Sequence, residues 1–196
     1  MADGYHINVV RHLPTAGNKQ RKYIGWTDEP IVESAELHRC LAPGQFVYGS
    51  DLLRARQTAA LYFPKAVYTA DWRWRECNFG EFEGRTYADL ERDMNYRNWI
   101  DDPCMFAPSG GESLRELEAR VLSAHLELPN GSIVVTHGGP IRALLTKFSP
   151  TVKTFWSWEI PHGSGYRLEW ENEQAFKEGT ACTSISAVPI MAKETL

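Results

Sequence analysis

Two short apolar segments, each running directly into a histidine motif, constrain the fold of this chain most. The segment HINVV at 6–10 precedes an Arg-His pair, and the segment SIVVT at 132–136 precedes a His-Gly-Gly run. Both are rich in β-branched residues, which favour strands, and the second is apolar enough to be buried on both faces. We therefore expect two interior strands whose ends carry polar chemistry.

Further strands and helices alternate along the chain. The predicted strands are 6–10, 46–49, 66–69 and 132–136, with a C-terminal pair near 165–170 and 183–189. Periodicity and capping residues predict helices at 31–41, from Ser50 or Asp51 to about Tyr62, at about 112–127 with Ser113 near its start, and from Gly138 onward. This alternation predicts an α/β fold, a three-layer α/β/α sandwich around a mainly parallel sheet.

The stretch from 72 to 111 departs from that pattern. It is dense in aromatic residues, holds several Gly and Pro residues, and has no long periodic run. We interpret the chain, 1–196, as a single domain with this stretch as an inserted, lid-like segment containing one short helix near 86–99. Its aromatic side chains fit a local core better than a ligand cage.

The predicted topology brings the two histidine motifs together. In open α/β sheets, ligands bind beyond the carboxyl ends of the strands. His12 follows the first strand and His137 follows the strand at 132–136, so both histidines are expected at the same edge of the sheet.

Composition narrows the classes of partner. The formal net charge is -4 and the pI is about 5.9, without the basic surface typical of a nucleic-acid binder. No segment has the roughly 18 consecutive apolar residues of a membrane span, and the first residues do not resemble a signal peptide. The four cysteines form no CxxC pair. We expect a cytoplasmic protein that binds neither nucleic acid nor membrane, with a homodimer left open.

Four separated motifs carry a family resemblance. They are RHLPT at 11–15 with Asn18 after it, SDLLRARQTA at 50–59, RECNFGEFEG at 75–84 and VTHGGPIR at 135–142. In this order they resemble the histidine phosphatase superfamily, which includes the cofactor-dependent phosphoglycerate mutases. The resemblance implies the phosphoglycerate mutase-like fold, and the predicted C-terminal strands fit it.

The residue types suit phosphoryl transfer, in which charge stays on the peripheral oxygens and catalysis is mainly positioning and electrostatics. Arg11 and Arg54 can each offer a planar fork of donors to those oxygens, and His137 adds another donor. A helix starting at Gly138 can add backbone N–H groups. The resemblance also assigns Asn18 to phosphate binding.

By resemblance, His12 is the nucleophile that forms a phosphohistidine. Neutral imidazole has one basic nitrogen, and a pKa of about 6.5 keeps it available near neutral pH. Glu76 is separated from NFGEFEG by one cysteine. It is the expected general acid that protonates the leaving alkoxide and the expected general base that deprotonates water. Glu81 and Glu83 are the alternatives. This chemistry requires neither a cofactor nor a metal.

One position departs from the family. Glycine usually follows the nucleophilic histidine, whereas this chain has Leu13. We expect Leu13 to change the geometry or specificity of the pocket while its backbone carbonyl still orients His12. Unchanged substrate preference and turnover in Leu13→Gly would contradict this hypothesis.

Several functions remain in competition. The segment 77–111 is short and net acidic, unlike the large basic insertion of the mutases, so water is the favoured phosphoryl acceptor. YIGWTDEPI at 23–31 and NWIDDP…PSGGESL at 98–114 resemble α-ribazole-5'-phosphate phosphatases of cobalamin biosynthesis. Alternatives are a broad-specificity sugar-phosphate phosphatase, a phosphoglycerate mutase, a catalytically impaired phosphate-binding regulatory module, and a metal hydrolase using His12, His137 and Glu76. Two arginines in a cation site disfavour the last.

Overall fold

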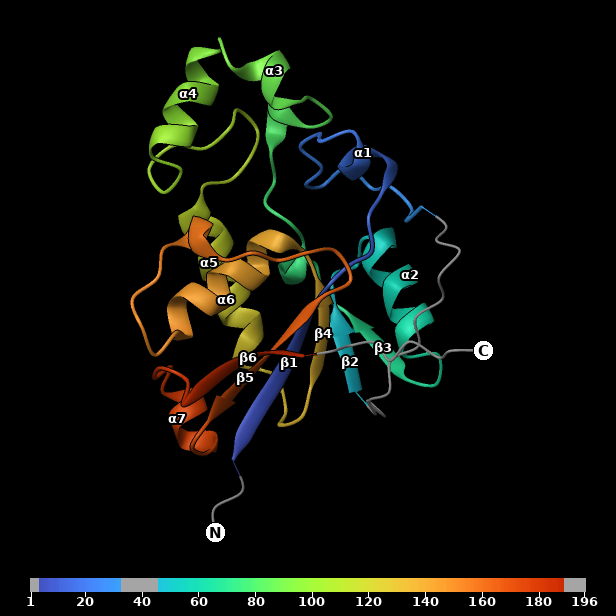
Figure 1. Ribbon diagram of the computed structural model, residues 1–196, viewed down its shortest axis with the longest axis vertical. Helices are drawn as coiled ribbons and strands as arrows, with labels where there is room; N and C mark the ends of the chain where they lie inside the picture. Colours follow the sequence, from blue (N-terminus) through green and yellow to red (C-terminus); the bar gives the residue numbers. More distant parts are fainter. Residues whose placement is uncertain (1–3, 33–45, 189–196) are drawn as a thin grey trace.

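The computed structural model describes residues 4–32 and 46–188, which form an α/β fold around a six-stranded mixed sheet (Figure 1). The strands are β1 (Tyr5–Arg11), β2 (Phe46–Gly49), β3 (Val67–Ala70), β4 (Ile133–Thr136), β5 (Gly165–Trp170) and β6 (Ser184–Val188), in the spatial order β3-β2-β4-β1-β5-β6. The first four are parallel to one another, β5 runs antiparallel to β1, and β6 runs antiparallel to β5. The predicted α/β architecture is confirmed.

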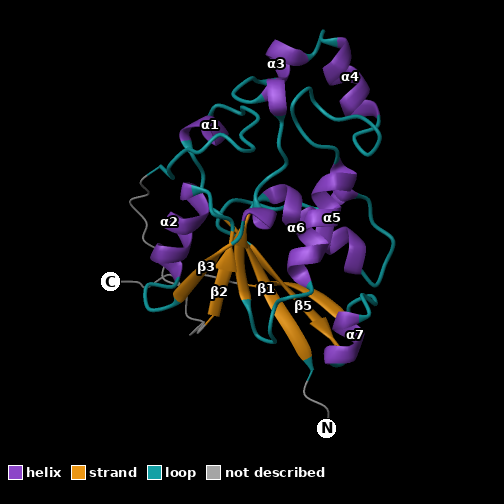
Figure 2. Cartoon of the chain, turned by 180° about the vertical axis from the view of Figure 1, so that it is seen from behind, coloured by secondary structure: helices purple, strands orange, loops and turns teal. Residues whose placement is uncertain are grey.

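Two apolar cores on opposite faces of the sheet explain its three layers. On strand β4, Val134 packs into the larger core, whereas Ile133 and Val135 pack into the smaller one, as the alternation of a strand requires. Helices α5 (Leu114–His125), α6 (Gly138–Phe148) and α7 (Glu173–Lys177) cover the first face, and α2 (Leu53–Tyr62) covers the second (Figure 2).

The segment between β3 and α5 contains no strand and builds a small core of its own. After two 3₁₀ turns, Trp72–Trp74 and Gly80–Phe82, it forms α3 (Tyr87–Leu90) and α4 (Met94–Asp101), which lie above the carboxyl edge of the sheet beside α1 (Ala16–Lys19) (Figure 1). Its buried side chains are Phe82, Leu90, Tyr96 and Trp99. Most of its other aromatic rings are exposed or pack against this cluster.

Several predicted helix limits are wrong for identifiable reasons. Neither Ser50 nor Asp51 caps α2; its N-cap is Leu52, because Ser50 Oγ accepts from the Leu52 N–H and Asp51 pairs with Arg75. The single helix predicted near 86–99 is two helices, since the Asp93 carboxylate caps a new start at α4. The helix predicted at 31–41 lies almost wholly outside the described residues.

Helix α5 shows how a local signal fixes an end. Ser113 accepts from the Glu116 N–H while the Glu116 carboxylate accepts from the Ser113 N–H, a reciprocal capping box. The predicted start near Ser113 is confirmed, although the helix proper begins at Leu114 and not at 112. The same box between Thr15 and Asn18 starts α1, which the sequence analysis did not anticipate. No helix within 4–32 and 46–188 is long and apolar enough to cross a membrane.

Candidate active site

Pairing of β1 with β4 places the two histidine motifs side by side. Arg11 aligns with Thr136 in the parallel register, and the His12 N–H donates to the Thr136 carbonyl over 2.9 Å. The rings of His12 and His137 lie 4.9 Å apart, at 62° to each other. The expectation that these residues meet at one edge of the sheet is confirmed by this geometry.

His12 is oriented by its own loop. Its Nδ1 lies 2.6 Å from the Leu13 carbonyl oxygen. A carbonyl can only accept, so Nδ1 carries the proton and Nε2 keeps the lone pair. His12 is 2% exposed, and burial, together with the charge of Arg54, holds its pKa well below the usual value. His12 therefore presents a neutral imidazole with a basic Nε2.

Leu13 supports this arrangement through its backbone. The Leu13 N–H donates to Thr58 Oγ1 over 2.9 Å, and Thr58 is itself bonded to the Arg54 carbonyl. The leucine side chain packs against the smaller core, beside α2. The prediction that the Leu13 carbonyl orients His12 is confirmed, and the predicted effect on specificity stays a prediction.

Arg54 is fully buried and ties His137 to a neighbouring loop. Its Nε donates to His137 Nδ1 over 3.2 Å, while its Nη1 and Nη2 donate to the carbonyls of Thr27 (2.9 Å) and Gly25 (2.6 Å). Because His137 Nδ1 accepts, the proton of this ring resides on Nε2. That Nε2 is buried and has no hydrogen-bond partner among the described residues. Burial first, and Arg54 second, hold the pKa of His137 well below its usual value.

The loop that holds Arg54 is in turn held by Glu83. The Glu83 carboxylate accepts five hydrogen bonds of 2.8–3.2 Å from the backbone N–H groups of Gly25, Trp26, Thr27 and Phe79. Glu83 is thus committed to the loop and not available as the general acid, and Glu81 is exposed. Of these three glutamates, only Glu76 faces the polar cluster, which consists of His12, His137, Arg11 and Arg54.

Glu76 lies against the N-terminus of α6. Its Oε1 accepts from the N–H groups of Gly139 and Cys77, both at 2.9 Å, while the contact of Oε2 within the described part of the chain is with Gly139 N, at 3.2 Å. A Cβ on Gly139 would stand 2.2 Å from Oε1, so this approach requires glycine. Arg120 fixes the main chain by donating to the Glu76 carbonyl over 2.8 Å.

Arg11 contributes a second guanidinium, on a half-buried side chain. Its Nη1 donates to the Ile160 carbonyl over 2.6 Å, and its Nε is buried without a partner among the described residues. Burial lowers the pKa of Arg11, although the charge of Glu76 opposes that effect. Gly138 packs against it, because a Cβ at that position would lie 3.5 Å from Arg11 Cζ. Unpartnered donors of Arg11 and His137 thus share a cluster that also contains Arg54.

Asn18 reaches this cluster through a residue that the sequence analysis missed. Its Oδ1 lies 3.1 Å from His162 Nε2, and the His162 ring is 5.2 Å from that of His12. His162 precedes β5, which pairs antiparallel with β1, so the beginning of β5 lies where β1 ends. The pairing of β5 with β1 would have indicated His162, but no pattern in the sequence predicts that pairing.

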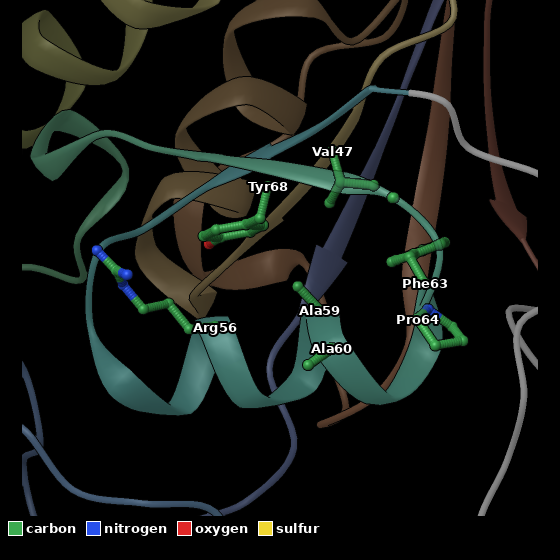
Figure 3. A pocket seen from close by; sticks show the side chains of 8 residues that line it. Val47, Arg56, Ala59, Ala60, Phe63, Pro64 and Tyr68 are labelled. Carbon is green, nitrogen blue, oxygen red and sulfur yellow. The ribbon is translucent and has the colours of Figure 1, made fainter.

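A separate cavity lies away from these residues. It measures about 300 Å³ and opens between α2 and the strands β2 and β3, where Val47, Ala59, Phe63 and Tyr68 line it (Figure 3). None of the predicted site residues lines this cavity. Among the described residues, no group of three or more His, Cys, Asp or Glu side chains could hold a metal ion.

Comparison with known proteins decides the family. The model of the histidine phosphatase superfamily (branch 1) matches residues 7–182. The chain belongs to this superfamily. A 2,3-bisphosphoglycerate-dependent phosphoglycerate mutase of Methylocella silvestris is 30% identical, over 87% of this chain and 95% of the relative. Superfamily members are phosphatases or mutases.

Solved structures agree with this assignment. The crystal structure of a phosphoglycerate mutase from Thermus thermophilus superposes with a TM-score of 0.71 and 28% identity, over 93% of this chain and 99% of that one. A protein of Escherichia coli K-12, provisionally named an α-ribazole-5'-phosphate phosphatase, has a TM-score of 0.76 at 20% identity, over 97% of this chain and 98% of its own. At that identity it shows the shared fold alone.

Proposed function

We propose that this histidine phosphatase superfamily member is a phosphomonoesterase that acts through a phosphohistidine at His12 on a small phosphorylated metabolite. One observation carries the proposal: a neutral imidazole with a free basic Nε2 lies among buried donors that lack partners within the described residues, Arg11 Nε and His137 Nε2. Buried polar groups are normally satisfied, so unpartnered donors around a nucleophile favour an anion as the missing partner.

The geometry supports the following first step. The lone pair of His12 Nε2 attacks phosphorus, the phosphorus–oxygen bond to the alcohol breaks, and the leaving oxygen takes a proton from Glu76. Guanidinium groups of Arg11 and Arg54, with His137 Nε2–H, balance the charge on the peripheral oxygens. Oε2 is the Glu76 oxygen suited to carry that proton, because Oε1 already accepts from two N–H groups.

The second step reverses these roles. Glu76, now a carboxylate, takes a proton from water as the water oxygen attacks phosphorus. The nitrogen–phosphorus bond breaks and its electron pair returns to His12 Nε2, which regenerates the neutral imidazole. Gly138 and Asn18 are proposed to support phosphate binding, Gly138 through the start of α6.

Water is the proposed acceptor because the segment 77–111 is net acidic. A net negative segment above the pocket disfavours retention of a doubly phosphorylated intermediate, which a mutase cycle needs. The α-ribazole-5'-phosphate and sugar-phosphate alternatives share this chemistry and differ only in the alcohol. We propose phosphate monoester hydrolysis as the activity, with α-ribazole 5'-phosphate as one candidate substrate.

An assay with p-nitrophenyl phosphate tests the proposal. The wild-type protein should release p-nitrophenol in the presence of EDTA, and His12→Ala should abolish the release. No turnover of any phosphate ester would favour the regulatory-module alternative, and loss of activity in EDTA would favour a metal hydrolase. Incubation with 3-phosphoglycerate separates the remaining pair, because a phosphatase releases inorganic phosphate whereas a mutase accumulates an isomer.

A further inference from the structure

His162 stands next to the nucleophile, and no step of the proposed reaction uses it. Its ring centre is 5.2 Å from that of His12, at an interplanar angle of 67°. Neither the sequence motifs nor the phosphoryl chemistry assigned it a role.

The turn that carries His162 is hydrogen-bonded to the end of β1 by residues both before and after His162 in the sequence. The Gly163 N–H donates to the carbonyls of Arg11 (3.1 Å) and His12 (3.3 Å), and the Ile160 carbonyl accepts from Arg11 Nη1. Gly163 itself has a positive φ of 74°, a conformation that favours glycine. The position of the His162 backbone is therefore set by the same residues that form the phosphate pocket.

Asn18 fixes which ring nitrogen of His162 carries the proton. The Thr15 N–H donates to Asn18 Oδ1 over 3.1 Å, which identifies that atom as the oxygen of the amide. His162 Nε2 lies 3.1 Å from the same oxygen, so Nε2 must donate. Nδ1 of the neutral ring is left with a lone pair that can accept a hydrogen bond.

The surroundings keep this ring neutral. Burial, followed by the charges of Arg11 and Arg54, lowers the pKa of His162 to about 4. A neutral Nδ1 can only accept, and its lone pair is repelled by the oxygens of a phosphoryl group. Its natural partner is a donor elsewhere in the substrate, and the alcohol portion of a phosphate monoester is where such donors occur.

We propose that His162 Nδ1 accepts a hydrogen bond from a hydroxyl group of the substrate and so selects phosphate monoesters whose alcohol carries a further hydroxyl group. This inference rests on the proposed phosphatase function and adds the class of alcohol that the site recognises. A site built to pair with a hydroxyl group discriminates against an analogue that lacks it, because the acceptor is then left unsatisfied.

Matched substrates measure this selectivity directly. Glycerol 1-phosphate and n-propyl phosphate differ only in their hydroxyl groups, so the ratio of their kcat/KM values reports hydroxyl recognition and cancels effects common to both. For the wild-type protein we expect a ratio of roughly ten or more, as for one satisfied hydrogen bond. A ratio near one would overturn the inference.

Two substitutions separate recognition from anchoring. His162→Asn keeps an oxygen acceptor near the position of Nδ1 but loses the donor to Asn18, whereas His162→Gln keeps a donor near the position of Nε2 and loses the acceptor. We expect the Asn variant to retain most of the ratio and the Gln variant to fall toward one. The reverse order would show that His162 acts only by anchoring to Asn18.

The same experiment distinguishes the role of His162 from the phosphatase function on which it rests. Turnover of p-nitrophenyl phosphate by the wild-type protein without any preference for the hydroxylated ester overturns the role of His162 alone. Absence of turnover with all three esters overturns the proposed function and this inference together.

Discussion

Two fully buried histidines, His137 and His125, occupy different environments in the same molecule. His137 lies at the carboxyl edge of the sheet, where Arg54 bonds its Nδ1 and its Nε2 lacks a partner among the described residues. His125, at the end of α5, has no hydrogen-bond partner for either ring nitrogen among the same described residues. Its ring packs against those of Phe148 and Phe176, 4.7 and 4.3 Å away. Burial lowers the pKa of both histidines.

The difference shows that burial and an unpartnered nitrogen do not by themselves mark a functional histidine. Cations, a second imidazole and a carboxylate converge on the region of His137, whereas aromatic rings surround His125. An unpartnered nitrogen can bind a ligand in the region of His137, whereas it lowers the stability of the fold in the region of His125. The contrast between the pocket and the aromatic core can be tested by substitution.

The largest effect is expected at the pocket carboxylate. Glu76→Gln removes the proton donor and should lower the turnover of an alkyl phosphate by about 10²–10⁴. The loss in kcat/KM, which reports the phosphorylation step, should be smaller with p-nitrophenyl phosphate, whose leaving group needs little protonation. Steady-state kinetics with both esters gives the comparison, and an equal loss in kcat/KM with the two would remove the general-acid role from Glu76.

The same substitution at the two histidines should then give opposite outcomes. His137→Leu removes a donor to the phosphoryl group and should lower kcat by roughly 10²–10³, as for a lost donor to transition-state charge. His125→Leu should leave kcat nearly unchanged. Equal losses measured with p-nitrophenyl phosphate on folded protein would mean that the contrast between the regions is not functional.

A smaller loss of activity is expected at Glu83, which acts on the site only through the loop that holds Arg54. In Glu83→Gln, the side-chain amide presents either its NH₂ group or its weaker carbonyl acceptor to the backbone N–H groups of loop 25–27. Carbonyl groups of this loop accept hydrogen bonds from Arg54. We expect kcat/KM to fall about tenfold. The control is Glu81→Gln on the exposed neighbour, and indistinguishable kinetics for the two variants would separate Glu83 from the pocket.

The smallest effect concerns stability and pH. The folded-state pKa of His125 is lowered to about 3 from an ordinary value of 6.5, so the unfolded chain binds the extra proton first as pH falls. This titration leaves the stability of the protein unchanged above pH 6.5 and lowers it progressively down to about pH 3, at about 1.4 kcal/mol per pH unit.

His125→Leu should therefore be more stable than wild type by on the order of 1 kcal/mol at pH 7, because a buried polar ring is removed. The gap should widen as the pH falls toward about 4, within the range over which His125 titrates on unfolding. Urea unfolding of both proteins across this pH range measures the gap, and parallel stability curves would show that His125 does not titrate on unfolding.

Much of the site could be predicted because it depends on strand ends. His12 and His137 each follow an apolar strand, and the carboxyl ends of parallel strands meet at one edge. The start of α5 was readable from Ser113 and Glu116 because a capping box is a purely local interaction.

The missed features depend on contacts between distant segments. His162 joins the site only because β5 pairs antiparallel with β1, and the N-terminus of α2 begins at Leu53 because Asp51 pairs with Arg75. Nothing local in the sequence distinguishes His125, deep in an aromatic core, from a ligand histidine. Long-range pairing and side-chain competition decide such positions, and neither is expressed in periodicity or propensity.

The most direct test of the proposed mechanism is the identity of the phosphorylated residue. The protein should be mixed with an excess of p-nitrophenyl phosphate, quenched within milliseconds in alkaline denaturant, digested and analysed by mass spectrometry. We predict a single added phosphoryl group on His12, absent from His12→Ala and accumulating in Glu76→Gln. A wild-type protein that turns over the ester while the phosphoryl group appears on another residue, or on none, would contradict the mechanism.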